Sequence, residues 1–183
     1  MFKTFKTDLQ KYKEYSGKSI GILLLTQQGL WALFVYRILN GIFKSKLPVI
    51  FKTILLGFGV ITQKGVEIIT GISIPYTVTL GKRFYIGHFG GIIINAHAVI
   101  GDNCNISQGV TIGVSGIDQK RGVPVIGNNV YIGAHAVVAG KITVGDGAVI
   151  GANSLVTKDV LGHTTVLGVP AIKINDHDSK GYI

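Results

Sequence analysis

The strongest constraint on the fold of this chain is a repeat of aliphatic side chains with a period of six residues. From residue 126 to residue 157, every sixth residue is Ile or Val, and the residue after it is Gly, Ala or Thr. A helix repeats about every 3.6 residues and a strand about every 2, so neither explains this pattern. It is typical of a solenoid in which each hexad forms one short strand and one corner. The aliphatic positions are Ile126, Ile132, Val138, Val144, Ile150 and Val156.

The same period continues towards the N-terminus with two interruptions. A slip of two residues occurs around Gly90 and Gly91, and the stretch between Ile112 and Ile126 is two residues longer than two hexads. Residues 114–125 in that stretch lack the character of the repeat, so we expect them to form a loop outside the solenoid. The further aliphatic positions are Ile68, Ile74, Leu80, Ile86, Ile94, Ile100, Ile106 and Ile112.

The chain therefore divides into three expected parts. Residues 1–66 form an N-terminal helical segment, residues 67–175 form the repeat domain with its loop, and residues 176–183 form a polar tail. The length of 183 residues suits one domain with an appendage. A hydrophobic content of 47% is enough for a large core.

The N-terminal segment reads as helical and strongly basic. Apolar residues from Trp31 to Ile42 recur one helical turn apart, and we expect helices over residues 5–15, 20–43 and 48–60. Residues 1–64 carry ten Lys or Arg and two Asp or Glu, a net charge of +8 out of +9 for the whole chain. The repeat region is therefore nearly neutral.

A basic and apolar helical segment has more than one interpretation. It lacks interleaved basic and stacking residues, so we expect no nucleic-acid partner. Its longest charge-free run, residues 19–36, is marginal for a membrane span of about 20 apolar residues. The favoured interpretation is that the helices pack against the repeat domain or against sister subunits. The alternative is a peripheral contact with an anionic membrane surface.

The single cysteine bears on the compartment. Cys104 excludes an intrachain disulfide and indicates a reducing environment. It lies in a corner of a hexad, so we expect a small packed residue rather than a nucleophile. The N-terminus lacks the short apolar run and small-residue cleavage site of a signal peptide. We therefore expect a cytoplasmic protein.

Two motifs in the repeat resemble the hexapeptide-repeat acyltransferases, and within them the serine acetyltransferase branch. They are YIGHFGGIII at residues 85–94 and ISQGVTIG at residues 106–113. Residues 28–37 and 163–171 are also similar to parts of that branch. The resemblance implies a mainly β fold, a left-handed parallel β-helix shaped as a triangular prism, with an N-terminal α-helical segment. It also implies a homotrimer with active sites between neighbouring prisms.

The resemblance implies acetyl transfer from acetyl-CoA to a hydroxyl group. A hydroxyl is a poor nucleophile at neutral pH, so a positioned base must remove its proton. His88 stands at the family's catalytic position, and an imidazole titrates near neutrality. Gly90 and Gly91 leave backbone N–H groups open to a developing oxyanion. The alternative for His88 is a structural histidine at a corner.

The residues that the resemblance assigns to acetyl-CoA are small or basic. Gly113, Ala134 and Ala152 match positions where the pantetheine arm bonds to backbone groups, and Ser115 matches a loop threonine. Lys158 is the candidate partner of a CoA phosphate. The five histidines are too scattered for a metal-ligand spacing, so we expect no metal.

Four positions depart from the serine acetyltransferase pattern. Ser73 and Gly87 stand where that branch has aspartates, and Gly122 and Val123 stand where it has an Arg-His pair. Such charged groups would hold the two charged ends of serine. Their absence favours a saccharide acceptor, such as a capsule or exopolysaccharide precursor. Two alternatives stay open: serine O-acetylation by a rearranged site, and a non-catalytic β-helix that serves as a scaffold.

Overall fold

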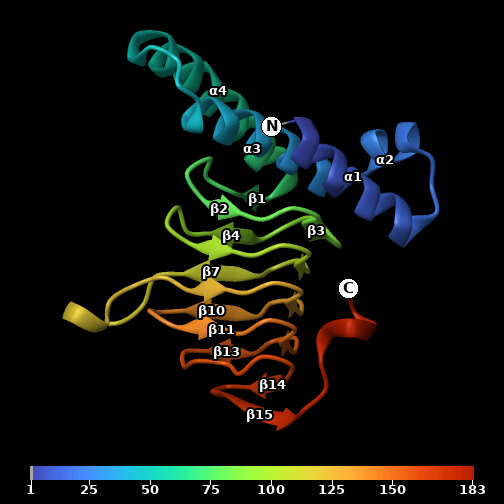
Figure 1. Ribbon diagram of the computed structural model, residues 1–183, viewed down its shortest axis with the longest axis vertical. Coiled ribbons are helices and arrows are strands. Elements are labelled where there is room, and N and C mark those ends of the chain that lie inside the picture. Colours follow the sequence, from blue (N-terminus) through green and yellow to red (C-terminus); the bar gives the residue numbers. More distant parts are fainter. Residues whose placement is uncertain (1) are drawn as a thin grey trace.

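The computed structural model describes residues 2–183 and shows a layer of helices on one end of a prism of three parallel sheets (Figure 1). The helices come first in the chain, and the coils of the prism then follow one another away from them. The helices are α1 (Phe2–Ser16), α2 (Ile20–Thr26), α3 (Gln28–Lys44) and α4 (Val49–Thr70). Two short 3-10 helices, η1 (Asp118–Lys120) and η2 (Ser179–Gly181), lie in the loop and in the tail.

Each of the first four coils of the prism contributes one strand to each of three sheets. Sheet A has the order β1 (Ile72–Ser73), β4 (Ile92–Ile94), β7 (Thr111–Gly113), β10 (Val137–Ala139) and β13 (Leu155–Val156). Sheet B has the order β11 (Thr143–Val144), β8 (Val125–Ile126), β5 (Val99–Ile100) and β2 (Thr79–Leu80). Sheet C has the order β15 (Ala171–Asn175), β14 (Thr165–Gly168), β12 (Val149–Ile150), β9 (Tyr131–Ile132), β6 (Asn105–Ile106) and β3 (Tyr85–Ile86). Among the strand pairs of residues 2–183, only β14–β15 is antiparallel.

The six-residue repeat supplies the core of the prism. In sheet A the residue pairs Ile94–Ile112, Ile112–Val138 and Val138–Val156 lie in register, and all four side chains are buried. Burying one such side chain stabilises the fold by about 1.5–3 kcal/mol. The expected solenoid is confirmed, and residues 114–124 lie outside the repeat as a loop that ends where β8 begins at Val125. Ile68 is an exception, because it lies in α4 and is 83% exposed.

The helical segment differs from the expected helices in two places. The second expected helix is two helices, α2 and α3, which meet at Gln27 with a bend of 90°. The third does not end near residue 60 but continues to Thr70, across the expected domain boundary at residues 66 and 67. It ends there because Gly71 adopts a left-handed conformation with φ of 65° and caps the helix through its N–H.

The C-terminal tail is packed against the prism. Tyr182 stacks on Tyr131 of sheet C with ring centroids 4.7 Å apart, and Ser179 is buried. Tyr15 of α1 stacks on Tyr85 of the same sheet and donates a hydrogen bond to the Tyr182 carbonyl. Helix α1 and the tail therefore cover sheet C together, whereas sequence analysis identified the tail only as polar.

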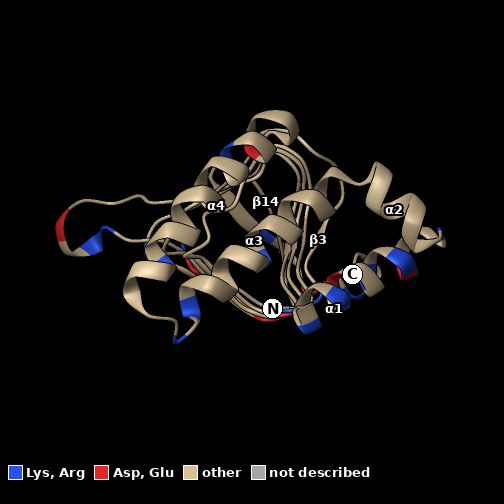
Figure 2. Ribbon diagram, turned by 90° about the horizontal axis from the view of Figure 1, so that it is seen from above, with Lys and Arg blue, Asp and Glu red and all other residues tan. Residues whose placement is uncertain are grey.

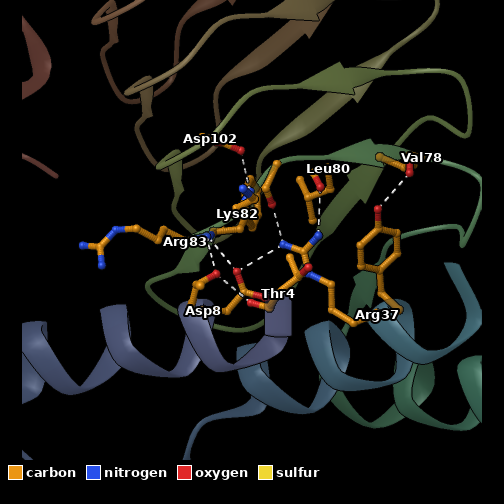
Figure 3. A network of polar contacts seen from close by, with 12 residues as sticks. Thr4, Asp8, Arg37, Val78, Leu80, Lys82, Arg83 and Asp102 are labelled. Atoms are coloured by element: carbon orange, nitrogen blue, oxygen red, sulfur yellow. Dashed lines mark hydrogen bonds and ion pairs between the residues drawn. The ribbon is translucent and has the colours of Figure 1, made fainter. Parts of the chain in front are cut away.

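A buried ion pair joins two helices to the first coil (Figure 3). The Arg37 guanidinium donates to both carboxylate oxygens of Asp8, at 2.9 and 3.1 Å, and also to the Leu80 and Gly81 carbonyls. Asp8 accepts a further hydrogen bond from the Phe84 N–H at 2.9 Å. The Asp8 side chain is 0% exposed and the Arg37 side chain is 5% exposed. The pair therefore connects α1, α3 and the chain between β2 and β3.

Replacing Asp8 by Asn should strongly destabilise the protein. The change leaves the buried Arg37 charge without its counter-ion, which typically costs about 3–5 kcal/mol. Urea denaturation followed by circular dichroism measures the loss. Glu14→Gln is the matched control, because Glu14 pairs with Arg83 on the surface and solvent screens that pair. Equal losses in the two variants would contradict this role for Asp8.

Lys11 is a second buried charge, and it has no such compensation. Its side chain is 1% exposed and its Nζ has no hydrogen-bond partner within residues 2–183. Burial lowers the pKa of Lys11 to about 8 from 10.5. Between these values the unfolded chain binds the proton more readily, so the contribution of Lys11 to stability rises with pH.

Lys11→Met should therefore stabilise the protein, because it removes a buried cation but keeps the apolar stem. The expected gain in unfolding free energy is about 3 kcal/mol at pH 7 and about 2 kcal/mol at pH 9. Denaturation curves of both proteins at the two pH values measure this difference. Lys13→Met, at an exposed position of the same helix, should give little change. A gain that does not shrink as pH rises would contradict the predicted pKa of Lys11.

Candidate active site

His88 lies at the corner between sheets C and A, two residues after the end of β3. Its side chain is exposed and borders a cavity of about 320 Å³. One wall of the cavity is the stretch from Tyr85 to Phe89, and the other is the junction of α2 and α3, from Thr26 to Gly29. An imidazole at this position can exchange a proton with a hydroxyl held in the cavity.

Sequence analysis missed the second wall of the cavity. Gln27 has an extended backbone, with φ of −104° and ψ of 98°, and it caps both α2 and α3. Gln28 and Gly29 follow, and Gly29 is buried. A Cβ atom on Gly29 would collide with the Tyr12 hydroxyl and lie 2.9 Å from the Ile86 Cβ. Gly29 therefore lets the start of α3 approach the strand that leads to His88. The available sequence signal for this wall was the pair of amide side chains, Gln27 and Gln28, within an otherwise apolar run.

Tyr12 of α1 holds β3 in place directly before His88. Its hydroxyl donates to the Ile86 carbonyl and accepts from the Ile86 N–H, both at 3.0 Å. Burial raises the pKa of Tyr12 well above its ordinary value, so the hydroxyl stays protonated and can fill both roles. The Tyr12 hydroxyl therefore bonds both the N–H and the carbonyl of Ile86, the last residue of β3.

Ala134 and Ala152 lie at the same corner of the prism as His88. Backbone hydrogen bonds connect the coils along this corner: the Gly109 N–H donates to the Gly90 carbonyl, His135 to Gln108, and Asn153 to Ala134. These residues lie between sheets C and A in successive coils. The corner is therefore a column of hydrogen-bonded backbone segments that begins at the His88 motif.

Gly113, Ser115 and Lys158 lie at the opposite edge of sheet A. Gly113 ends β7, and Ser115 pairs with Gly122 at the base of the loop. Ser115 lines a cavity of about 510 Å³ together with loop residues, residues of the next coil and Thr157. Lys158 is exposed next to Thr157. Within one chain the predicted site residues thus form two groups, one on each side of sheet A.

A carboxylate lies beside Ser73, although the strand itself carries none there. Glu67 of α4 accepts a hydrogen bond from the Lys64 Nζ at 2.6 Å. Burial tends to raise the pKa of Glu67, but the interactions with Lys64 and with the nearby Ser73 hydroxyl outweigh it, and the pKa is lowered. Glu67 is therefore an anion at neutral pH, and it comes from the helix rather than from the repeat.

His135 and His163 have structural positions at corners of the prism. His135 and His163 have positive φ values of 59° and 55°, and their rings lie over Gly109 and Gly147. A side chain on either glycine would collide with the ring above it. No group of three or more His, Cys, Asp or Glu residues able to hold a metal ion occurs within residues 2–183. Cys104 is buried, as expected, and burial raises its pKa to about 11.

Comparison with known proteins identifies the family of this chain. A family model described as "Bacterial transferase hexapeptide (six repeats)" matches residues 124–158. A serine acetyltransferase of Bacillus pumilus is 37% identical over 181 residues, 98% of this chain and 80% of that protein. The chain belongs to the serine acetyltransferase family. The expected family and the expected left-handed parallel β-helix are confirmed, and the chain is an acetyl-CoA-dependent acyltransferase.

Solved structures of the family agree with this assignment. The Neisseria gonorrhoeae serine acetyltransferase in complex with serine matches with a TM-score of 0.80 at 30% identity, covering 94% of this chain and 68% of that one. A serine acetyltransferase in complex with CoA matches with a TM-score of 0.78 at 26% identity, covering 94% and 68%. Acetyl-CoA is the acetyl donor, as expected.

The expected saccharide acceptor is wrong. These relatives are serine acetyltransferases, and they match nearly the whole chain. The expectation rested on the lack of charged groups at positions 73, 87, 122 and 123. It considered only groups carried by the strands and the loop, and it therefore missed the Glu67 carboxylate beside Ser73. The expected role in polysaccharide biosynthesis is not supported either.

Tyr12→Phe should lower both stability and turnover. It leaves the N–H and carbonyl of Ile86 without their partner, which costs about 1–3 kcal/mol, and it loosens the strand that positions His88. Denaturant unfolding and acetyl-CoA turnover at a temperature well below unfolding measure the two effects.

Tyr36→Phe is the matched control for this prediction. The Tyr36 hydroxyl donates one buried hydrogen bond to the Val78 carbonyl, at 2.8 Å, and lies outside the His88 cavity. It should lose stability but keep its turnover. Equal turnover in the two variants would show that Tyr12 does not position His88.

Proposed function

We propose that this protein transfers the acetyl group of acetyl-CoA to the hydroxyl of serine. The observation that carries the proposal is the whole-chain similarity to serine acetyltransferases, together with the structural match to a family member in complex with serine. The cavity beside His88 has the size and polarity for a small polar acceptor, because Thr26, Gln27 and Gln28 line it. The proposed acceptor is therefore a free amino acid.

His88 is the proposed general base. Its exposed imidazole borders the cavity and can accept the proton of the serine hydroxyl as the oxygen attacks the acetyl carbon. The same proton can then go to the departing thiolate. Gly90 and Gly91 have positive φ values of 97° and 66°, which turn the chain sharply behind His88. Their N–H groups are the proposed donors to the developing oxyanion.

The proposed acetyl-CoA contacts follow the two edges of sheet A. Gly113, Ala134 and Ala152 have no bulky side chain, so backbone groups beside them stay accessible to a pantetheine arm. Ser115 lines the cavity at the base of the loop, and the exposed Lys158 can pair with a phosphate. Bound acetyl-CoA supplies an activated thioester, and these residues orient it.

A homotrimer is part of the proposal. The single chain separates the His88 group from the Gly113 group, and a neighbouring prism can bring one group of each chain together. Sheet A also presents apolar side chains outwards, including Ile93, which is 55% exposed. Such a row on a prism face suits contact with another copy. The cytoplasmic location stays a prediction, supported by the free Cys104 and by the use of acetyl-CoA.

Thiol release from acetyl-CoA in the presence of serine tests the proposed function. The wild-type protein should release CoA with serine, and His88→Ala should lower the rate by about 10²–10⁴ because the general base is lost. His97→Ala is the control, since His97 is exposed in a turn outside the cavity. Ethanolamine and serine methyl ester, which lack a free carboxylate, test recognition of that group.

Two outcomes would contradict the proposal. One is the absence of CoA release with serine by a folded protein that binds acetyl-CoA. The other is serine-dependent release that survives His88→Ala, which would show that another group is the base.

A further inference from the structure

Helix α4 has an apolar side that nothing in the chain covers. Its other side packs on α3, with Leu56, Gly59, Gln63 and Val66 half-buried at spacings of three and four residues. The uncovered side chains include some of the most exposed apolar residues of the protein, with Phe58 at 71% and Ile61 at 70%. We define the outer face of α4 as Ile50, Ile54, Phe58, Ile61 and Ile68, all of them exposed.

The outer face of α4 carries no charge. Successive residues of a helix are rotated by about 100°, so these five residues fall on one side of α4. The charged residues Lys52, Lys64 and Glu67 point towards α3 or lie at the edge of the outer face. Lys52 donates from its Nζ to the Ser45 carbonyl, and Lys64 pairs with Glu67 at 2.6 Å. Figure 2 shows most of α4 in tan, with coloured segments only towards its ends. A continuous apolar face of this length is unusual for a side open to water.

Basic side chains lie next to this apolar face. Lys46 is exposed in the turn between α3 and α4, next to the exposed Leu47, and Lys64, at the edge of the face, has a side chain that is 64% exposed. The net charge of +8 in residues 1–64 belongs to the same helical layer. An apolar helix face flanked by lysines is the pattern of a helix that lies in the interface of an anionic bilayer.

The contacts of α4 favour lying on a membrane over crossing it. With 22 residues, α4 is long and apolar enough to cross a membrane. However, one side of it packs along α3, and the Gln63 amide donates to the Ile74 carbonyl of the prism. The helix also continues directly into β1. A span would separate these contacts, whereas an interfacial position keeps them and buries only the outer face.

We propose that the outer face of α4, with Lys46 and Lys64 beside it, docks this protein on the surface of an anionic lipid bilayer. The apolar side chains enter the acyl boundary and the lysines meet the lipid phosphates. The prism, on the other side of the helical layer (Figure 1), stays in water with its active site. Docking goes beyond the proposed acetyl transfer and does not depend on it.

Vesicle co-sedimentation of the full-length protein, purified without detergent, tests the docking. Vesicles of phosphatidylcholine with about a third phosphatidylglycerol should retain the protein, and vesicles of phosphatidylcholine alone should retain much less. The double variant Phe58→Ser and Ile61→Ser should lower the partition coefficient at least about tenfold, because two buried apolar side chains are lost. Lys46→Glu with Lys64→Glu should lower it by a similar factor on the anionic vesicles only.

A matched control separates the outer face from general hydrophobicity. Leu161 and Ile172 are 70% and 63% exposed on the prism, far along the chain from α4. Leu161→Ser with Ile172→Ser also removes two exposed apolar side chains and should bind vesicles like the wild-type protein. The Phe58 and Ile61 variant should also keep its acetyl-transfer rate in solution, so failure of docking and failure of the proposed reaction are distinguishable.

Three outcomes would overturn the docking proposal. The first is wild-type protein that does not sediment with anionic vesicles. The second is equal loss of binding in the α4 variant and in the prism control. The third is that the wild type does not bind vesicles and that the α4 variant has a different molar mass in light scattering. This combination would show that a second copy of the chain covers the outer face.

Discussion

The structure depends on the stacking of inward aliphatic side chains from coil to coil. Each coil places the same position of its hexad above that of the coil before it, as in the series Ile94, Ile112, Val138 and Val156 of sheet A. Because the side chains of a strand alternate, one inward residue also sets which residues face outwards and where the corners fall. The column of corners that starts at His88 and passes Ala134 and Ala152 is a consequence of this core.

The joint between the helices and the prism fixes the orientation of the helical layer, which the repeat alone does not. Several buried or half-buried polar connections cross it, among them the Asp8–Arg37 pair to the first coil, the Tyr12 hydroxyl to Ile86, the Tyr36 hydroxyl to Val78 and the Gln63 amide to Ile74. In each of them a side chain of a helix bonds a backbone group of the prism, so the helical layer is held at a defined orientation. This orientation brings the junction of α2 and α3 against the His88 corner and creates the cavity.

The acceptor shows how a site can be misjudged from aligned positions. Ser73, Gly87, Gly122 and Val123 lack charges that the resemblance assigns to them, and those absences favoured a sugar. The carboxylate of Glu67 lies beside Ser73 but comes from six residues earlier, on a helix. When a charged side chain comes from another helix or strand, the residue at the aligned position does not reveal it. Similarity over the whole chain was the better guide to the substrate class.

The sequence by itself determined the solenoid, the inward residues from Leu80 to Val156, the loop at residues 114–125 and the candidacy of His88. These depend on local periodicity and on a short motif, both of which can be read without distant contacts. Only the tertiary structure decided that the second expected helix breaks at Gln27, that α4 continues to Thr70, and that the tail packs on Tyr131. The physical reason is that each outcome depends on a partner far away in the sequence. Gly29 is needed because Ile86 and Tyr12 are close to it, and the outer face of α4 is exposed because α3 covers only the opposite side.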